Sequence, residues 1–350
     1  MIVNLPDAKA LDEMALRLHF SAWNRLRGVI DDWDSRIPDA PFSEPIPESW
    51  REEMEGYIED CQGDLQSTVA VIQQSNELAL KARLCAVSPY LLLLESQMPL
   101  STTPKPVDFF DLRTIDAQKL PQAVNTLCPD PLPPTFLTRY DRLRKTRNRY
   151  THLGQTGSDL HPLTMLAELM DLFAELWPDG AWLSDRLRVA EHDREAGFGD
   201  KFWNPAYGVL QMWPGDVELM PPARFKALFD VDPGRIDHLC HACRKNAETR
   251  EGLPGIVIPT AYVSDDGLAV ECLACQQRTG FGDEACEHPD CGARRMGVGD
   301  HDGLCHACGH ERGSLEDEPE PDGFQDSSGP LWRARMKLPS RDEPESETTG

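Results

Sequence analysis

Residues Arg142 to Gly154 read Arg-Leu-Arg-Lys-Thr-Arg-Asn-Arg-Tyr-Thr-His-Leu-Gly, and this stretch predicts the end of a basic helix. Leu143 and Leu153 lie on its apolar side, and Gly154 is the expected residue just past the helix end. The whole chain has a net charge of −24, so this helix stands out as strongly basic. A basic helix in an acidic protein is typical of one that contacts phosphate. The helix contains Asp141 and the following cations: Arg139, Arg142, Arg144, Lys145, Arg147 and Arg149.

The last turns of this helix place three functional side chains close together. Asn148 and His152 are four positions apart and share a helical face, so Asn148 can orient the imidazole by a hydrogen bond. Arg147 adds a fork of hydrogen-bond donors beside them. An imidazole that titrates near neutrality and a fixed cation that binds phosphate are the groups needed to cleave RNA without a metal.

These residues resemble a known family. The sequence from Arg147 to His152 matches the Arg-polar-x3-His signature of HEPN domains, and residues 76–82 resemble the Glu-x3-Lys helix common in that superfamily. The resemblance covers about a third of the chain, residues 64–177. It implies a helical bundle, usually a homodimer with the site in a cleft at the interface, and in many members a metal-independent endoribonuclease. Non-catalytic members are also known.

By this resemblance, Arg147 and His152 form the catalytic pair, Asn148 orients the imidazole, and Glu77 is a supporting carboxylate. Glu77 and Lys81 also fit a plain helix-stabilising pair, because they are four positions apart with the acid first. RNA binding is predicted for the other cations of the basic helix, and a solvated helix face is the alternative. These cations are Arg142, Arg144, Lys145 and Arg149. A toxin-like or defence role is implied by the family alone.

The cysteines predict a second functional site. Eight of the eleven lie in four close pairs: Cys240-x2-Cys243, Cys272-x2-Cys275, Cys286-x4-Cys291 and Cys305-x2-Cys308. A tight pair puts two thiolates on one turn, and a second pair carried by a hairpin completes a tetrahedron around Zn²⁺. The pattern predicts two structural zinc ions in two tandem zinc ribbons. Sequential pairing of the four pairs is the first expectation, and interleaved pairing stays open. The histidines next to these cysteines are predicted not to be ligands.

The segments around these pairs also predict strands. Residues 256–263, the turn Asp265-Asp266-Gly267 and residues 268–270 are typical of a β-hairpin. A shorter arm between the last two pairs carries the turn Gly299 to Gly303. Metal-binding cysteine pairs and the lack of a secretory signal predict a reducing, cytoplasmic location. The longest apolar run, Tyr90 to Leu94, is far too short to span a membrane.

The pattern along the chain predicts a mainly α protein with a helical bundle at residues 1–195. Apolar spacing indicates helices at 6–30, 50–62, 64–87, 116–127, 161–176 and 181–195, with the basic helix starting at Pro133 and Pro134. Residues 196–236 are expected to be a connecting segment with a strand at 207–213 and a helix at 222–229. The tandem zinc-ribbon module follows at 237–313. An acidic tail at 314–350 is predicted to be disordered, with Leu331 to Leu338 as a basic island for a protein partner.

Three functions fit the sequence. The first is a metal-independent endoribonuclease that attacks through the RNA 2′-hydroxyl and uses the zinc module for targeting. The second is a non-catalytic zinc-binding scaffold that contacts proteins. The third, a zinc-ribbon transcription regulator, fits least well, because acids outnumber Lys and Arg in residues 236–313 and a phosphate-binding surface should be basic.

Overall fold

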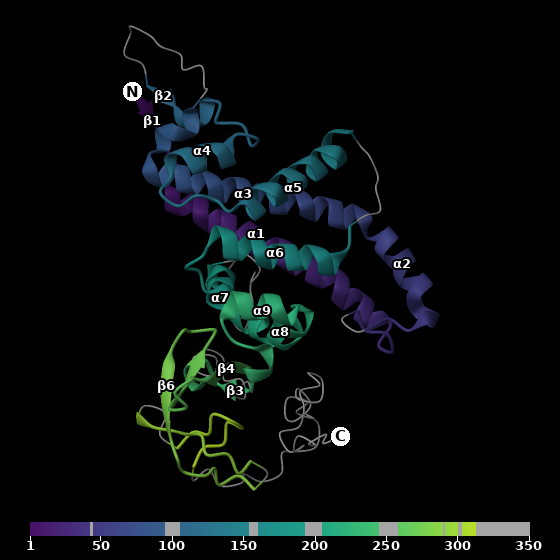
Figure 1. The fold of residues 1–350 in the computed structure, drawn as a ribbon, viewed down its shortest axis with the longest axis vertical. Coiled ribbons are helices and arrows are strands. Elements are labelled where there is room, and N and C mark those ends of the chain that lie inside the picture. The colour runs from purple at the N-terminus through teal and green to yellow at the C-terminus, as the bar shows by residue number, and fades with distance from the viewer. Residues whose placement is uncertain are drawn as a thin grey trace, which may run out of the picture. The chain divides into compact units, whose positions relative to one another are not determined.

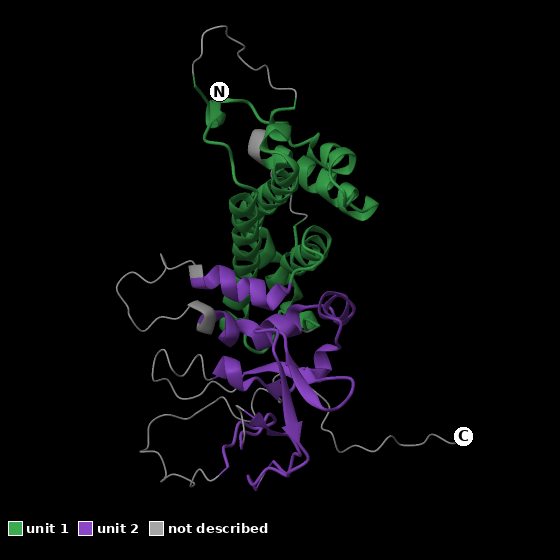
Figure 2. Cartoon of the chain, turned by 90° about the vertical axis from the view of Figure 1, so that its left-hand side faces the viewer, with its two compact units in different colours: residues 1–180 green, residues 181–350 purple. Residues whose placement is uncertain are grey.

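The computed structural model describes residues 1–42, 45–94, 106–153, 160–192, 205–244, 258–289, 291–299 and 303–312, without the side chains of residues 151–153, 192 and 205–207. The chain divides into two compact units, Met1–Gly180 and Ala181–Gly350 (Figure 2). The first is helical, and the second combines helices with a small sheet. The predicted fold, mainly α with β-rich cysteine modules, is confirmed. The predicted disordered tail at 314–350 lies outside the described residues.

The first unit is a bundle of α-helices with one short β-ladder (Figure 1). Its helices are α1 (Ala8–Arg36), α2 (Arg51–Asp60), α3 (Gln62–Val87), α4 (Leu120–Leu127), α5 (Pro134–Leu153) and α6 (Pro162–Leu176). Short 3-10 helices lie at Glu48–Trp50, Pro89–Leu93 and Phe109–Asp111. Strands β1 (Ile2–Val3) and β2 (Val107–Asp108) pair in parallel.

The bundle core follows the apolar spacing of the sequence. Helix α1 packs along α3 and also contacts α6, while α5 and α4 pack against α3. The buried positions recur at three- and four-residue intervals, as amphipathic helices require. They include Leu16, Trp23, Leu26 and Ile30 on α1, Leu65, Val69, Ile72 and Leu80 on α3, and Leu166, Leu169 and Phe173 on α6.

Helix α1 continues beyond the predicted end at residue 30. It reaches Arg36 because Trp33 is also buried, and the Trp33 indole donates a hydrogen bond to the Ala40 carbonyl at 2.6 Å. At its other end, the Asp7 carboxylate accepts from the Ala10 amide at 2.8 Å, which caps the helix. Residues 31–36 therefore belong to helix α1 and to the bundle.

The second unit begins with α7 (Trp182–His192), α8 (Pro205–Leu219) and α9 (Pro222–Phe229). An aromatic core joins them, in which Trp213 lies 6.3 Å from Trp182 and 6.1 Å from Phe225 between ring centroids. The bundle was expected to extend to residue 195, and the two compact units divide after Gly180, where α7 begins and packs on α8. One sequence prediction is wrong here. The predicted strand 207–213 is part of helix α8, because its buried residues recur every four positions: Val209, Trp213 and Val217.

A 3-10 helix at Pro233–Arg235 follows, and the described strands of this unit form one curled antiparallel sheet, ordered β3-β4-β5-β6-β7. Its strands are β3 (His238–Leu239), β4 (Pro259–Val263), β5 (Ala269–Cys272), β6 (Arg278–Gly282) and β7 (Met296–Gly297). The predicted hairpin is confirmed by the β4–β5 pair, whose turn places Gly267 at φ 71°. Strand β6 was not predicted, and it joins both cysteine regions into one sheet. Most of the predicted turn at 299–303 lies outside the described residues.

Candidate metal centres and the basic helix

The first cysteine group lies at the ends of β3 and β5. Cys240 follows β3 and begins a helical turn that includes Cys243, while Cys272 ends β5 and precedes Cys275. The sulfur of Cys240 lies 3.5 Å from that of Cys275, and Cys243 and Cys272 are 3.8 Å apart. Four thiolates about 2.3 Å from a tetrahedral zinc ion stand about 3.8 Å from one another, whereas a disulfide bond measures about 2.05 Å. The spacing therefore fits zinc and not a disulfide.

The second group has the same geometry with less secondary structure around it. Cys286 and Cys308 have sulfurs 3.7 Å apart, and Cys291 and Cys305 are 3.8 Å apart. Cys286 and Cys305 are buried with Met296 in a small cluster. In each group the four ligand atoms lie within 4.8 Å of one another.

These groups are the sequential pairing that the sequence left as one of two possibilities. Neither contains a histidine, although His241 lies between Cys240 and Cys243 and His306 between Cys305 and Cys308. All eight cysteines are free thiols. Among the described residues, the candidate ligands are Cys240, Cys243, Cys272 and Cys275 for the first centre, and Cys286, Cys291, Cys305 and Cys308 for the second.

The surroundings of the sulfurs favour thiolates that share a cation. The amide of Ala274 donates to the Cys272 sulfur at 3.3 Å, and the amide of His288 points to the Cys286 sulfur at 3.5 Å. The hydrogen bond between Cys305 and Cys308 lowers the pKa of Cys305 and raises the pKa of Cys308, so the two sulfurs share one proton in the absence of a cation. Four negative sulfurs cannot coexist at this spacing unless a cation neutralises them. The donor set therefore suits Zn²⁺.

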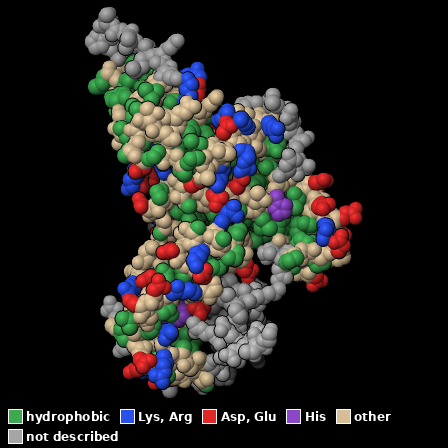
Figure 3. Space-filling view, in the orientation of Figure 1, with side chains coloured by type: hydrophobic (Ala, Val, Ile, Leu, Met, Phe, Trp, Pro, Cys, Tyr) green, Lys and Arg blue, Asp and Glu red, His purple; other side chains and the backbone are tan. Residues whose placement is uncertain are grey.

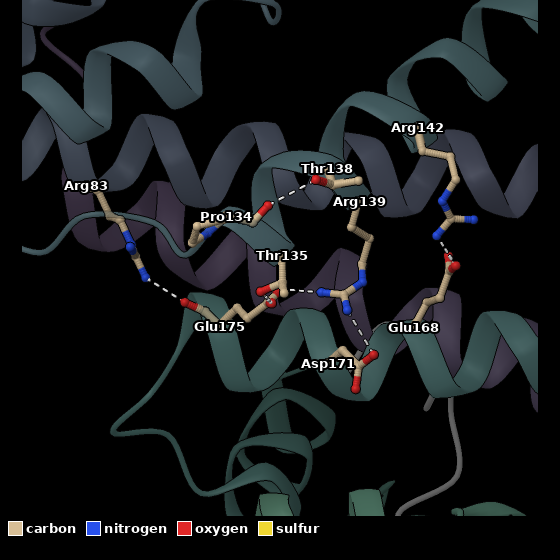
Figure 4. A network of polar contacts seen from close by, with 9 residues as sticks. All are labelled: Arg83, Pro134, Thr135, Thr138, Arg139, Arg142, Glu168, Asp171 and Glu175. Carbon is tan, nitrogen blue, oxygen red and sulfur yellow. Dashed lines mark hydrogen bonds and ion pairs between the residues drawn. The ribbon is translucent and has the colours of Figure 1, made fainter.

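The basic helix α5 pairs with acidic side chains of α6 (Figure 4). Arg139 forms ion pairs with Glu175 and, at 2.9 Å, with Asp171, and Arg142 pairs with Glu168. The three carboxylates are spaced three and four positions apart, so they line one face of α6. Complementary charge on a neighbouring helix is thus a second reason, besides phosphate, for so many cations in α5.

The other predicted RNA-binding cations are distributed along the same helix. Arg144 and Lys145 both pair with Asp141, at 2.8 and 2.5 Å. Arg149 is exposed, and no ion pair joins it to another side chain in the described part of the chain. On the face drawn in Figure 3, the Lys and Arg side chains are interspersed with Asp and Glu. Several cations on α5 are thus neutralised within the bundle, which weakens the phosphate argument.

Arg147 contacts Glu77, and both belong to the predicted catalytic set. Its Nη1 donates to Glu77 Oε1 at 2.9 Å and so joins α5 to α3. Gln73 also donates to Glu77 Oε1, at 3.4 Å, whereas the predicted helix partner Lys81 donates to Thr114 at 3.5 Å. Arg147 is 32% exposed and Glu77 18% exposed.

Asn148 is half-buried on the same helix. The backbone of His152 lies in α5, but its side chain lies outside the described residues. Whether the imidazole faces Arg147 therefore stays a prediction.

Two structural contacts escaped the sequence analysis. The acidic face of α6 could have been found, because Glu168, Asp171 and Glu175 follow helical spacing. The contact between His241 and His306, described below, had no signal in the sequence, because it joins two turns far apart along the chain.

The fold and the two cysteine groups define a protein with a helical bundle and a module whose two tetracysteine groups could each hold a metal ion. No family model, curated protein or solved structure matches the chain. Within the described ranges, no helix has both the length and the apolar character required to cross a membrane.

Proposed function

We propose that this chain is a zinc-dependent scaffold protein whose second unit holds two structural zinc ions and presents a metal-ordered surface to a protein partner. The observation that carries the proposal is the sulfur spacing of 3.5–3.8 Å in two groups of four cysteines. With four thiolates at each centre, the ion has no open position for substrate or water, so its role is structural. Each four-thiolate centre also adds negative charge, which favours a protein partner over nucleic acid.

The direct test is metal content and its effect on each unit. The purified, reduced chain should contain two zinc ions, measured by elemental analysis and by zinc released on thiol modification. The double variant Cys272→Ser/Cys275→Ser should retain one ion. Removing zinc with a strong chelator should abolish the amide protection of β4 and β5 while α1 and α3 stay protected, because metal binding supplies folding free energy only to its own module. Absence of bound metal in the native chain would overturn the proposal.

A second candidate is the metal-independent endoribonuclease of HEPN type. The observation that favours it is the position of Arg147, which is partly exposed and held by Glu77. In this mechanism His152 acts as general base or acid at the 2′-hydroxyl and the leaving oxygen, and Arg147 stabilises the developing charge on phosphorus. Asn148 orients the imidazole, and a homodimer completes the cleft. The products carry 2′,3′-cyclic phosphate and 5′-hydroxyl ends.

One experiment distinguishes the scaffold function from the nuclease function. Wild type and His152→Ala are incubated with mixed RNA in the presence of EDTA, after circular dichroism has verified that both are folded. Cleavage by wild type alone supports the nuclease, and the zinc module is then its targeting device. Equal absence of cleavage in several buffers leaves the scaffold function. His161→Ala, which changes a histidine outside α5, is the matched control and should cleave like wild type.

A further inference from the structure

The two metal centres touch through the turns that carry their cysteine pairs. The ring of His241, inside the Cys240–Cys243 turn, lies 4.5 Å from the ring of His306, inside the Cys305–Cys308 turn, measured between centroids. The two rings are 2% and 0% exposed. Each turn therefore forms part of the wall that buries the other.

Hydrogen bonds also join the Cys240–Cys243 turn to the Cys305–Cys308 turn. The Leu239 amide donates to the His306 carbonyl at 2.7 Å, and His306 Nδ1 donates back to the Leu239 carbonyl at 2.9 Å. Arg244, directly after the first turn, donates to the Gly309 carbonyl at 2.7 Å, directly after the second. These bonds fix the backbone on both sides of the two cysteine pairs, so the turns cannot shift independently.

The two centres differ in how much other structure supports them. The first is built into the sheet, and its strand β4 is tied to helix α8 by a hydrogen bond from the Trp213 indole to the Pro259 carbonyl at 3.1 Å. The second lies among turns and short bridges, with a buried cluster of Cys286, Met296 and Cys305. The Cys305–Cys308 turn bonds to Arg295 and bridges to Met296, and its packing on the first centre adds the contacts of His306 with Leu239 and His241.

We propose that the two centres bind metal with positive coupling, so that filling one raises the affinity of the other. The proposal rests on the zinc-binding function proposed above and adds its regulation. A metal at the first centre fixes the Cys240–Cys243 turn, which pre-orders the Cys305–Cys308 turn and lowers the entropy lost when the second ion binds. Coupling of this kind is reciprocal, and it commonly amounts to about 5- to 150-fold in affinity. The module consequently changes from empty to full over a narrow range of free zinc.

The test measures each centre with and without its neighbour in the full chain. Reduced apo-protein is titrated with Co²⁺ and then with Zn²⁺ in competition with a chelator of known affinity, and thiolate-to-cobalt absorption reports each site. Cys240→Ser/Cys243→Ser leaves only the second centre, and Cys305→Ser/Cys308→Ser leaves only the first. We expect each isolated centre to bind at least about tenfold more weakly than in the complete chain, by the same factor in both directions.

A second variant keeps all eight ligands and changes the contact alone. Arg244→Ala removes the hydrogen bond to Gly309, and Arg278→Ala is the matched control, because Arg278 pairs with Asp266 in the β4–β5 turn region. Arg244→Ala should reduce the coupling severalfold while both cobalt spectra stay tetrahedral, and Arg278→Ala should leave it unchanged. Two centres that fill independently in the wild type, with equal affinities in the single-centre variants, would overturn the coupling but not zinc binding. Absence of tetrahedral cobalt in every variant would overturn zinc binding itself.

Discussion

Arg186 and Asp216 form an ion pair that is 1% and 0% exposed and joins α7 to α8 in the second unit. The Arg186 guanidinium also lies 5.2 Å from the centre of the Trp182 ring. A buried charge whose partner is removed loses its compensation while it stays out of water. This pair therefore makes α7 and α8 sensitive to single substitutions.

Asp216→Leu should destabilise these helices by about 3–5 kcal/mol, because it removes the carboxylate from beside a guanidinium that stays buried. The free energy of unfolding can be measured by urea titration in saturating zinc, with amide exchange of α8 as the local probe. Arg186→Met/Asp216→Leu is the control, and it should be much closer to wild type because neither charge remains. A double variant as unstable as the single one would show that packing, and not the uncompensated charge, causes the loss.

The Arg147–Glu77 pair should contribute less, because both side chains keep some contact with water. A double-mutant cycle with Arg147→Ala and Glu77→Ala should give a coupling free energy of about 1 kcal/mol. The matched control is Arg113–Asp116, whose side chains are 77% and 55% exposed, and whose coupling should be smaller because water screens the two charges. Equal coupling in both cycles would mean that Glu77 does not hold Arg147 in solution.

The sequence predicts those features that depend on local spacing. Helix α3 was expected at 64–87 and spans Gln62–Val87, because its apolar residues repeat with helical period. The eight cysteine ligands were expected from their close spacing, whereas their grouping was expected only as one of two possible pairings. Arg147 and Glu77 were expected in one site, by resemblance, and the structure places them in contact.

Features that depend on distant partners could not be predicted. The cations of α5 indicated phosphate, but two of them, Arg139 and Arg142, are paired with carboxylates of α6, a neighbour that spacing alone does not identify. Helix α8 was missed because it contains Pro214, a residue that ordinarily interrupts a helix. Its aromatic contacts with α7 and α9 outweigh that local preference. The boundary after Gly180 likewise depends on packing of α7 against α8.

Two glycines, Gly267 and Gly309, have a left-handed backbone, but only Gly309 is closely packed. Substituting each by Ala therefore distinguishes the effect of backbone strain from the effect of packing. Gly267, at φ 71°, has open space where a Cβ would stand, whereas a Cβ on Gly309, at φ 80°, would lie 2.6 Å from Arg244 Nη1 and 3.1 Å from Leu239 Cδ1. Both Ala variants should lose about 1 kcal/mol from backbone strain. Gly309→Ala should in addition displace Arg244 and weaken zinc binding at both centres. Competition titrations with a zinc chelator measure this difference, and equal affinities in the two variants would contradict it.

His19 makes the stability of the bundle depend on pH. It is fully buried against Phe20, Phe173 and Trp177, with ring centroids 5.3–5.6 Å away. Among the described residues neither of its ring nitrogens has a hydrogen-bond partner. Burial disfavours the charged ring and lowers the pKa of His19 from 6.5 to about 3.

The sign of the effect follows from linkage. Above pH 6.5 the His19 ring is neutral in both the folded and the unfolded chain, so it does not make the free energy of unfolding depend on pH. As the pH falls below 6.5, His19 becomes protonated in the unfolded chain but stays neutral in the folded chain until about pH 3. The free energy of unfolding therefore decreases by about 1.4 kcal/mol per pH unit in this window. His19→Leu should remove this slope.

The measurement is amide exchange of α1 and α3 between pH 8 and 5, where the stability difference between wild type and variant should change by about 2 kcal/mol. His161→Leu is the control, since His161 is only partly buried, and its slope should change less. Parallel curves for wild type and His19→Leu would mean that the folded bundle accepts the proton on His19.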